Sequence, residues 1–137
     1  MCASAIALAS QYDRNVPYAF NRKETKDHGE GGNIVGTDIN HKKILLIDDV
    51  ISAGTAIRES VEVLNAHNAK LMGVIISMNR QERGKGTQSA IQEVEQLFNI
   101  PVISIITLDN LLEYLQTDST LHAQLEKVRA YQKEYGV

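Results

Sequence analysis

The stretch that most constrains this chain is residues 44–56, which read ILLIDDVISAGTA. Four consecutive large apolar residues run directly into two adjacent carboxylates, Asp48 and Asp49. An uninterrupted apolar run is typical of a strand covered on both faces, as in a parallel sheet. A short loop, Ser52 to Thr55, comes next and precedes an amphipathic helix. The stretch therefore predicts a strand–loop–helix unit with its polar residues at the carboxyl end of the strand, where open α/β sheets bind ligands.

The predicted loop has the composition of an anion-binding site. Ser52 and Thr55 supply hydroxyls beside Gly54, and the first N–H groups of a helix lack intrahelical partners. Asp48 and Asp49 would repel a phosphate, but they suit the hydroxyls of a sugar that carries one, or a divalent cation bound with it. The stretch favours a ribose phosphate. Acidic metal pockets and nucleotide hydrolases also place an Asp pair after an apolar strand, so that alternative stays open at this point.

A second segment gathers positive charge in a chain whose net charge is −3. Its cationic or potentially cationic side chains are Arg22, Lys23, Lys26 and His28, and its glycines are Gly29, Gly31, Gly32 and Gly36. Because the segment has no apolar periodicity, residues 22–36 are predicted to form a mobile loop. Such a loop fits closure over a polyanion such as pyrophosphate. A solvated surface loop is the plainer alternative.

A third feature is Arg80, which follows the apolar strand predicted over residues 71–78. Parallel strands end at a common edge, so Arg80 is expected near the Asp pair. A planar guanidinium can hold a carboxylate through two parallel hydrogen bonds. The alternative for a single arginine is a surface ion pair.

Length and composition indicate one domain, since the chain has 137 residues and is 43% hydrophobic. The pI near 5.8 does not suggest a nucleic-acid surface. No apolar run reaches the length of a membrane span. The single cysteine, Cys2, excludes an internal disulfide and suits a reducing cytoplasm. The apolar start of the chain lacks the basic flank of a signal peptide.

Apolar periodicity predicts alternating helices and strands along the chain. The expected helices cover residues 1–10, about 55–68, about 89–98 with a capping box of Ser89 and Gln92, 108–116 and 121–135, and the expected strands cover 17–21, 43–48, 71–78 and 101–107. This alternation predicts an α/β fold with a parallel sheet flanked by helices.

Three strings together resemble one enzyme family. ILLIDDVISAGTA is similar to the phosphoribosyl pyrophosphate (PRPP) signature of the type I phosphoribosyltransferases. RKETKDHGEGG resembles the catalytic loop of the bacterial orotate phosphoribosyltransferases, and Arg80 in NRQERG matches their orotate-contacting arginine. The resemblance covers nearly everything from Pro17 to Val137. It implies a single type I phosphoribosyltransferase-like domain over residues 1–137 and a Mg²⁺-dependent pentosyltransferase. In that reaction orotate displaces pyrophosphate from PRPP and gives orotidine 5′-monophosphate in pyrimidine (UMP) biosynthesis.

The resemblance also implies a role for each matching residue. Lys26, Asp48 and Asp49 are expected to be catalytic, and Ser52 and Arg80 to contact orotate. The residues expected to bind PRPP are Arg22, Lys23, Lys26, His28, Asp48, Asp49, Val50, Ile51, Ser52, Ala53, Gly54, Thr55 and Ala56. No direct protein ligand to the metal is expected, because Mg²⁺ is carried with PRPP. The family's basic loop serves the neighbouring subunit, which implies a cytoplasmic homodimer with shared sites.

The chain departs from the family pattern in two places. Ser52 stands where family members often have Thr, and the hydroxyl is retained. The family also has a further N-terminal region, with a hood over orotate and a sheet strand between those matching residues 17–21 and 43–48. The chain is therefore expected to be an N-terminally truncated, C-terminal portion of such an enzyme. Two alternatives stay open: a non-catalytic PRPP- or nucleotide-binding module, or an inactive fragment.

Overall fold

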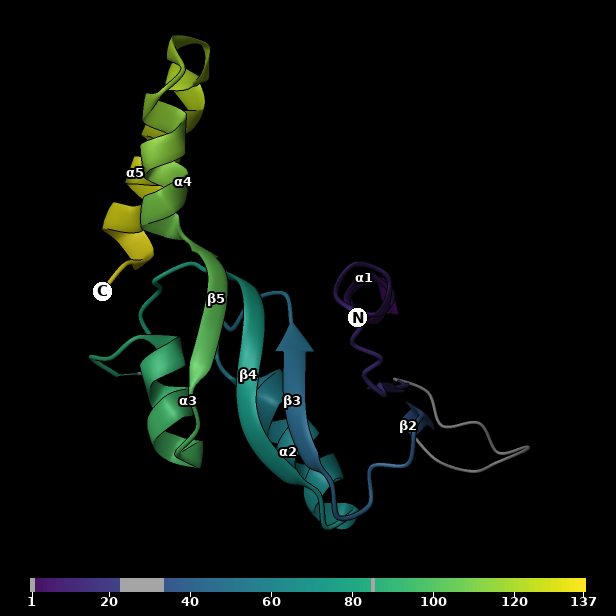
Figure 1. The fold of residues 1–137 in the computed structure, drawn as a ribbon. Coiled ribbons are helices and arrows are strands. Elements are labelled where there is room, and N and C mark those ends of the chain that lie inside the picture. Colours follow the sequence, from purple (N-terminus) through teal and green to yellow (C-terminus); the bar gives the residue numbers. More distant parts are fainter. Residues whose placement is uncertain (1, 23–33, 85) are drawn as a thin grey trace. The chain divides into compact units, whose positions relative to one another are not determined.

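The computed structural model describes residues 2–22, 34–84 and 86–137. The chain forms two compact units, Met1–Asn40 and His41–Val137 (Figure 1). Within the described ranges, no helix is both long enough and apolar enough to cross a membrane.

The first unit contains a helix and a small antiparallel pair of strands. Helix α1 spans Cys2–Tyr12, and strand β1 (Ala19–Asn21) pairs with β2 (Ile34–Gly36) so that Phe20 lies opposite Val35. The prediction that residues 34–36 belong to a mobile loop is therefore wrong, because the β-branched Ile34 and Val35 find a partner strand in β1. The other loop residues, 23–33, lie outside the described part of the chain.

The second unit is built on a parallel sheet of three strands in the order β3-β4-β5. These strands are Lys43–Asp48, Lys70–Asn79 and Val102–Thr107, and they confirm the predicted strands to within one or two residues. Asn79 pairs with Thr107 at the carboxyl end of the sheet, where β3 also ends, and β3 lies at one side of the sheet.

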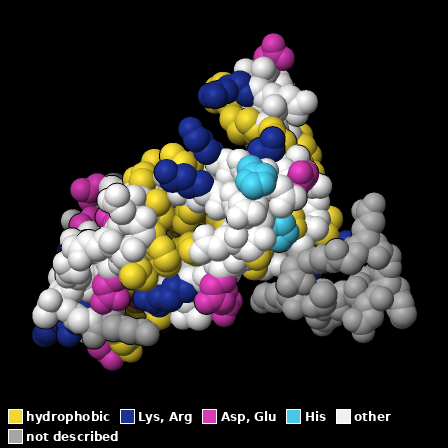
Figure 2. Space-filling model, turned by 90° about the horizontal axis from the view of Figure 1, so that it is seen from below, with side chains coloured by type: hydrophobic (Ala, Val, Ile, Leu, Met, Phe, Trp, Pro, Cys, Tyr) yellow, Lys and Arg dark blue, Asp and Glu magenta, His cyan; other side chains and the backbone are white. Residues whose placement is uncertain are grey.

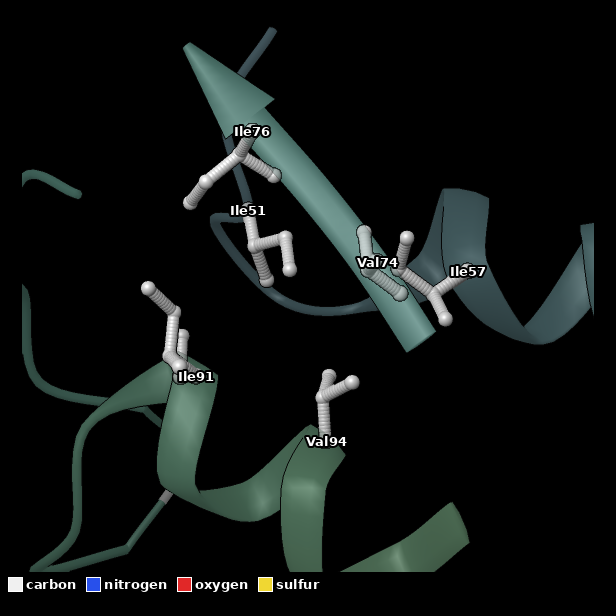
Figure 3. Close-up of a cluster of buried hydrophobic side chains, with 7 residues drawn as sticks. Ile51, Ile57, Val74, Ile76, Ile91 and Val94 are labelled. Carbon is white, nitrogen blue, oxygen red and sulfur yellow. The ribbon is translucent and has the colours of Figure 1, made fainter. Parts of the chain in front are cut away.

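Two helices cover one face of this sheet. Helices α2 (Thr55–Ala66) and α3 (Ala90–Phe98) pack on the side of β4 from which Val74 and Ile76 project. Figure 3 shows side chains from both helices and from the loop before α2 converging on β4. The buried cluster contains Ile51, Ile57, Val74, Ile76, Ala90, Ile91 and Val94. Burial of each large member stabilises the fold by about 1.5–3 kcal/mol. The predicted capping box starts α3, since Ser89 and Gln92 exchange hydrogen bonds of 2.9 and 3.1 Å.

The opposite face of the sheet carries apolar side chains that the helices of this unit do not cover. Leu45 on β3 is 53% exposed and Ile105 on β5 is 74% exposed, while Ile47 and Ile103 are also exposed. In the space-filling view of Figure 2, hydrophobic side chains reach the surface among charged ones. From the apolar run of β3, both faces of the sheet were predicted to be covered. Within His41–Val137, helices cover only one face.

The chain ends in a helical pair beyond the carboxyl end of β5 (Figure 1). Helix α4 (Leu108–Gln116) and helix α5 (His122–Tyr135), joined through the 3₁₀ turn Ser119–Leu121, pack through Leu112, Leu115 and Leu125. The last residues then return to the loop after β4, where the Val137 N–H donates to the Gln81 carbonyl over 3.2 Å.

Candidate active site

The two adjacent carboxylates lie where β3 ends, and each is tied to its own backbone. The Asp49 N–H donates to Asp48 Oδ1 over 2.9 Å, and the Val50 N–H donates to Asp49 Oδ1 over 2.8 Å. The Asp49 carbonyl accepts from the N–H groups of Ser77 and Met78, at 3.0 and 3.1 Å. The Asp pair is therefore anchored to β4 through the Asp49 carbonyl.

The two carboxyl groups have different pKa values. Burial raises the pKa of Asp48 above 3.8, the hydrogen bond from the Asp49 N–H opposes this, and the Asp49 carboxylate adds to the rise. The hydrogen bond from the Val50 N–H lowers the pKa of Asp49, the contact with Asp48 lowers it further, and Arg80 contributes least. Asp49 therefore ionises first, because two neighbouring carboxylates lose their protons in sequence.

The loop between β3 and α2 encloses a hollow of about 240 Å³. The residues around it are Asp48, Val50, Ile51, Ser52, Ala53, Gly54, Thr55, Ala56 and Ile57. The structure thus brings together the part of the predicted PRPP site that lies between Asp48 and Ala56, with Asp49 inside the same segment. This grouping could be predicted because all of these residues are adjacent in sequence.

Gly54 gives the loop its shape. It is the N-cap residue of α2 with φ 67, a left-handed conformation that glycine adopts without strain. A Cβ atom there would also lie 2.9 Å from Val94 Cγ2 in the core. Because glycine has no capping side chain, the first N–H groups of α2 receive no side-chain cap from Gly54. Such groups attract an anion.

Arg58, which the sequence analysis did not single out, closes the loop from the side of α2. Its Nη1 donates to the Ala53 carbonyl over 2.8 Å. The only sequence signal for this contact is an arginine one turn into the helix, from where a long side chain can reach back over the loop.

Arg80 follows the last residue of β4 and contacts the loop after β3. Its Nη2 donates to Ser52 Oγ over 2.6 Å and lies 2.9 Å from Glu82 Oε2. The Arg80 side chain is 31% exposed, whereas its Nε is buried and has no hydrogen-bond partner among the described residues. The two residues predicted to contact orotate are therefore neighbours in space. Glu82 was missed, although an acidic residue two positions after the arginine is visible in the sequence.

The remaining predicted site residues belong to the first unit or lie outside the described residues. Arg22 belongs to the first unit, where it is exposed. Lys23, Lys26 and His28 lie outside the described residues, so their roles stay predictions.

The site offers few metal ligands. Over residues 2–22, 34–84 and 86–137, no group of three or more His, Cys, Asp or Glu side chains is placed to hold a metal ion. Asp48 and Asp49 are two carboxylates, which is the number that Mg²⁺ usually takes from a protein when substrate phosphates supply the rest. The donor set therefore fits a magnesium ion that arrives with a phosphorylated substrate.

A larger hollow of about 640 Å³ lies beside the C-terminal helix. It is lined by Glu82, Arg83, Tyr131, Glu134 and Tyr135. Its lining contains neither a helix N-terminus nor the Asp pair, and its two glutamates would repel a phosphate. The smaller hollow is therefore the candidate active site.

Comparison with known proteins agrees with this geometry. A profile of the phosphoribosyl transferase domain matches residues 3–106, and the chain belongs to that family. Curated relatives are orotate phosphoribosyltransferases: that of Erwinia tasmaniensis is 58% identical over 134 residues, and that of Nitrosococcus oceani 53% over 135 residues. These matches take in 98% of this chain but only 62% and 61% of the two relatives.

Solved structures give the same result. The crystal structure of orotate phosphoribosyltransferase from Francisella tularensis matches with a TM-score of 0.79 and 40% identity, over 99% of this chain and 64% of that one. The Leishmania donovani UMP synthase structure, at 22% identity and a TM-score of 0.67, covers 95% of this chain and 27% of its own, and shows the fold alone. The predicted α/β fold and family resemblance are confirmed. The chain spans about three fifths of the length of its curated relatives.

Proposed function

We propose that this chain carries the PRPP and orotate sites of an orotate phosphoribosyltransferase, a pentosyltransferase of pyrimidine biosynthesis. The observation that carries the proposal is the 2.6 Å hydrogen bond between Arg80 and Ser52. It joins the Arg80 guanidinium to the loop that follows the Asp pair. This supports the proposal, because the reaction needs donors for the carboxylate of orotate and for the 5′-phosphate of PRPP close to acceptors for the ribose hydroxyls.

The 5′-phosphate of PRPP would occupy the hollow at the N-terminus of α2. The Ser52 and Thr55 hydroxyls and the uncapped N–H groups of the helix would donate to its oxygens. Asp48 and Asp49 would accept hydrogen bonds from the ribose hydroxyls. Their negative charge would also stabilise the positive charge that develops on the ribose ring in the transition state, without acting as nucleophiles.

Orotate would bind through its carboxylate to Arg80. A guanidinium presents parallel N–H groups to a carboxylate, and such a pair is stronger than a neutral hydrogen bond. The Arg80 side chain is 31% exposed, and its exposed part would receive the carboxylate. Ser52 would make the second contact through its hydroxyl oxygen, which can still accept a hydrogen bond when its O–H donates to the phosphate.

Lys26 would stabilise the charge on the departing pyrophosphate, together with Arg22, Lys23 and His28. Mg²⁺, carried in with PRPP, would neutralise part of the same charge, and Asp48 and Asp49 would contact it through its bound waters rather than as direct ligands. We further propose a cytoplasmic homodimer in which the basic loop of one subunit serves the site of the other.

The alternatives are a non-catalytic PRPP-binding module and an inactive fragment, because the chain spans 62% of the length of its relative. The test is the fall in orotate absorbance when this chain meets orotate, PRPP and Mg²⁺, with Lys26→Ala as the control. Turnover above that control supports the enzyme. PRPP binding without turnover supports the module, and neither binding nor turnover in a folded sample supports the fragment.

The role of Lys26 has its own expected outcome. Lys26→Ala should lower the turnover rate by about 100-fold or more while PRPP affinity changes only a few-fold, because its contact strengthens in the transition state. Equal losses of turnover and of PRPP affinity would contradict this role.

A further inference from the structure

The residue after Arg80 adopts an unusual backbone conformation. Gln81 has φ 53, which lies in the left-handed region that residues with a side chain rarely adopt. Such a conformation costs on the order of 1 kcal/mol and persists where the surroundings determine it. The loop that carries Arg80 is therefore held in place by contacts beyond its own sequence.

The Gln81 side chain is fixed at both of its polar atoms. Gln81 Nε2 donates to Asp109 Oδ2 over 2.8 Å, and the Asp109 N–H donates to Gln81 Oε1 over 2.9 Å. Asp109 is the second residue of α4, and its other oxygen accepts from Gln132 Nε2 over 2.9 Å. These three side chains, which we call the Gln81 network, join the loop after β4 to both C-terminal helices.

The backbone around Gln81 is fixed as well. The Gln81 N–H donates to Asn79 Oδ1 over 2.8 Å, and the Gln81 carbonyl accepts from the Val137 N–H over 3.2 Å. The Arg83 N–H donates to the Tyr135 carbonyl over 2.8 Å. The peptide groups on the C-terminal side of Arg80 thus have partners that lie about 50 residues further along the chain.

The guanidinium itself has much weaker support. Among the described residues, its polar contacts to Ser52 and to Glu82 are both made by the same atom, Nη2, and one common atom does not fix the plane of the group. The direction of the Arg80 side chain therefore depends on where the backbone places its Cα–Cβ bond. The Gln81 network sets that backbone.

We propose that Gln81, Asp109 and Gln132 are positioning residues that aim Arg80 and so determine the affinity for orotate rather than for PRPP. The ligand of Arg80 rests on the proposed function, whereas the aiming of Arg80 does not. None of the three side chains lines the hollow beside the Asp pair.

The network can be broken and restored without removing a side chain. Gln81→Glu replaces the amide that donates to Asp109 with a carboxylate that repels it. In the double variant Gln81→Glu with Asp109→Asn, the new amide at 109 donates to the new carboxylate at 81, and its carbonyl still accepts from Gln132. Gln124→Glu, the same chemical change at an exposed position of α5 outside the network, is the matched control.

Two measurements on the full chain test the proposal. The first is ¹⁵N relaxation of the Arg80 Nε–H group, which should show a less ordered side chain in Gln81→Glu and restored order in the double variant. The second is the affinity for orotate and, separately, for PRPP. Gln81→Glu should weaken orotate binding about tenfold and PRPP binding less than about twofold, as expected for the loss of one hydrogen bond to a charged group. The double variant should recover most of the loss, and Gln124→Glu should lose nothing.

The outcomes separate this inference from the proposed function. If the wild-type chain does not bind orotate, or Arg80→Ala leaves orotate affinity unchanged, the proposed role of Arg80 fails, and the relaxation measurement still decides whether Gln81 aims it. Unchanged Arg80 order in Gln81→Glu, no recovery in the double variant, or equal losses of orotate and PRPP affinity would each overturn the positioning role.

Discussion

The loop after β3 and the loop after β4 lie at the same edge of one sheet, but they are held in different ways. In the loop after β3, the N–H groups of residues 52–54 make no hydrogen bonds within the described part of the chain, and the loop borders an open hollow. In the loop after β4, Gln81, Arg83 and Gly84 all donate backbone N–H groups to protein acceptors.

This difference between the two loops corresponds to a different role for each. A loop that binds an anion must keep backbone donors free for the ligand. A loop that presents one side chain must instead fix its backbone, since a small rotation there displaces a long side chain. We call the loop after β3 (residues 49–54) the open loop and the loop after β4 (from residue 80) the fixed loop. The following predictions disrupt one loop at a time, from the largest expected effect to the smallest.

Gly54→Ala should damage the open loop most. The added Cβ would meet Val94 in a backbone conformation with φ 67. The free loop should relieve this strain, about 2–3 kcal/mol, by changing shape, and returning to the binding shape would lower PRPP affinity about 100-fold. Calorimetric titration with PRPP checks this. Gly86→Ala is the control, because a Cβ there has only one contact, at 3.8 Å. Normal PRPP affinity in Gly54→Ala would show that the loop tolerates another shape.

Arg80→Ala should damage the function of the fixed loop and change the open loop only by removing the hydrogen bond to Ser52 Oγ. Losing a charge-assisted pair costs about 2 kcal/mol, so orotate affinity should fall about 30-fold while PRPP affinity stays within about twofold. Arg129→Ala, which removes an exposed arginine that pairs with Glu126, is the control. A parallel loss of PRPP affinity would mean that the two loops do not act separately.

Acid should weaken the open loop through the Asp pair. Burial raises the pKa of Asp48, and the Val50 N–H lowers the pKa of Asp49. As the pH falls, Asp48 takes up a proton first, at a pH above 3.8, and PRPP affinity should then fall by up to about tenfold per pH unit. Carboxyl ¹³C titration checks the order of the two protons, and protonation of Asp49 before Asp48 would contradict it.

The raised pKa of Asp48 also predicts how the thermal stability of the chain depends on pH. The raised pKa of Asp48 means that its ionisation opposes folding, so Asp48→Asn should unfold at or above the wild-type temperature at neutral pH. That difference should shrink as the pH falls towards 3.8, where the unfolded chain also binds the proton.

Arg58→Ala should have the smallest effect. It removes one hydrogen bond to the Ala53 carbonyl, which is worth about 1 kcal/mol, so PRPP affinity should fall about threefold to tenfold. Orotate affinity should stay unchanged, and a larger loss for orotate than for PRPP would reverse the comparison between the loops.

The open loop could be predicted from sequence far better than the fixed one. Asp48 to Ala56 are contiguous, and the strand, the glycine and the helix start are local signals. The bond between Gln81 and Asp109 joins residues 28 positions apart, and no local pattern indicates it. Ser52 and Arg80, also 28 apart, could be expected together only because parallel strands end at one edge. The pairing of Ile34 and Val35 with β1 was missed because the glycine-rich segment before them dominated the pattern.

The sheet face that no helix of His41–Val137 covers has a consequence for calorimetry. Unfolding normally raises the heat capacity by about 12–15 cal/mol/K per residue, because apolar surface becomes hydrated. Leu45, Ile103 and Ile105 are already more than half exposed in the folded chain, so they add little to that increase. The heat-capacity change for unfolding His41–Val137 should therefore lie below the average for a segment of that length. Its stability should vary with temperature along a flatter curve.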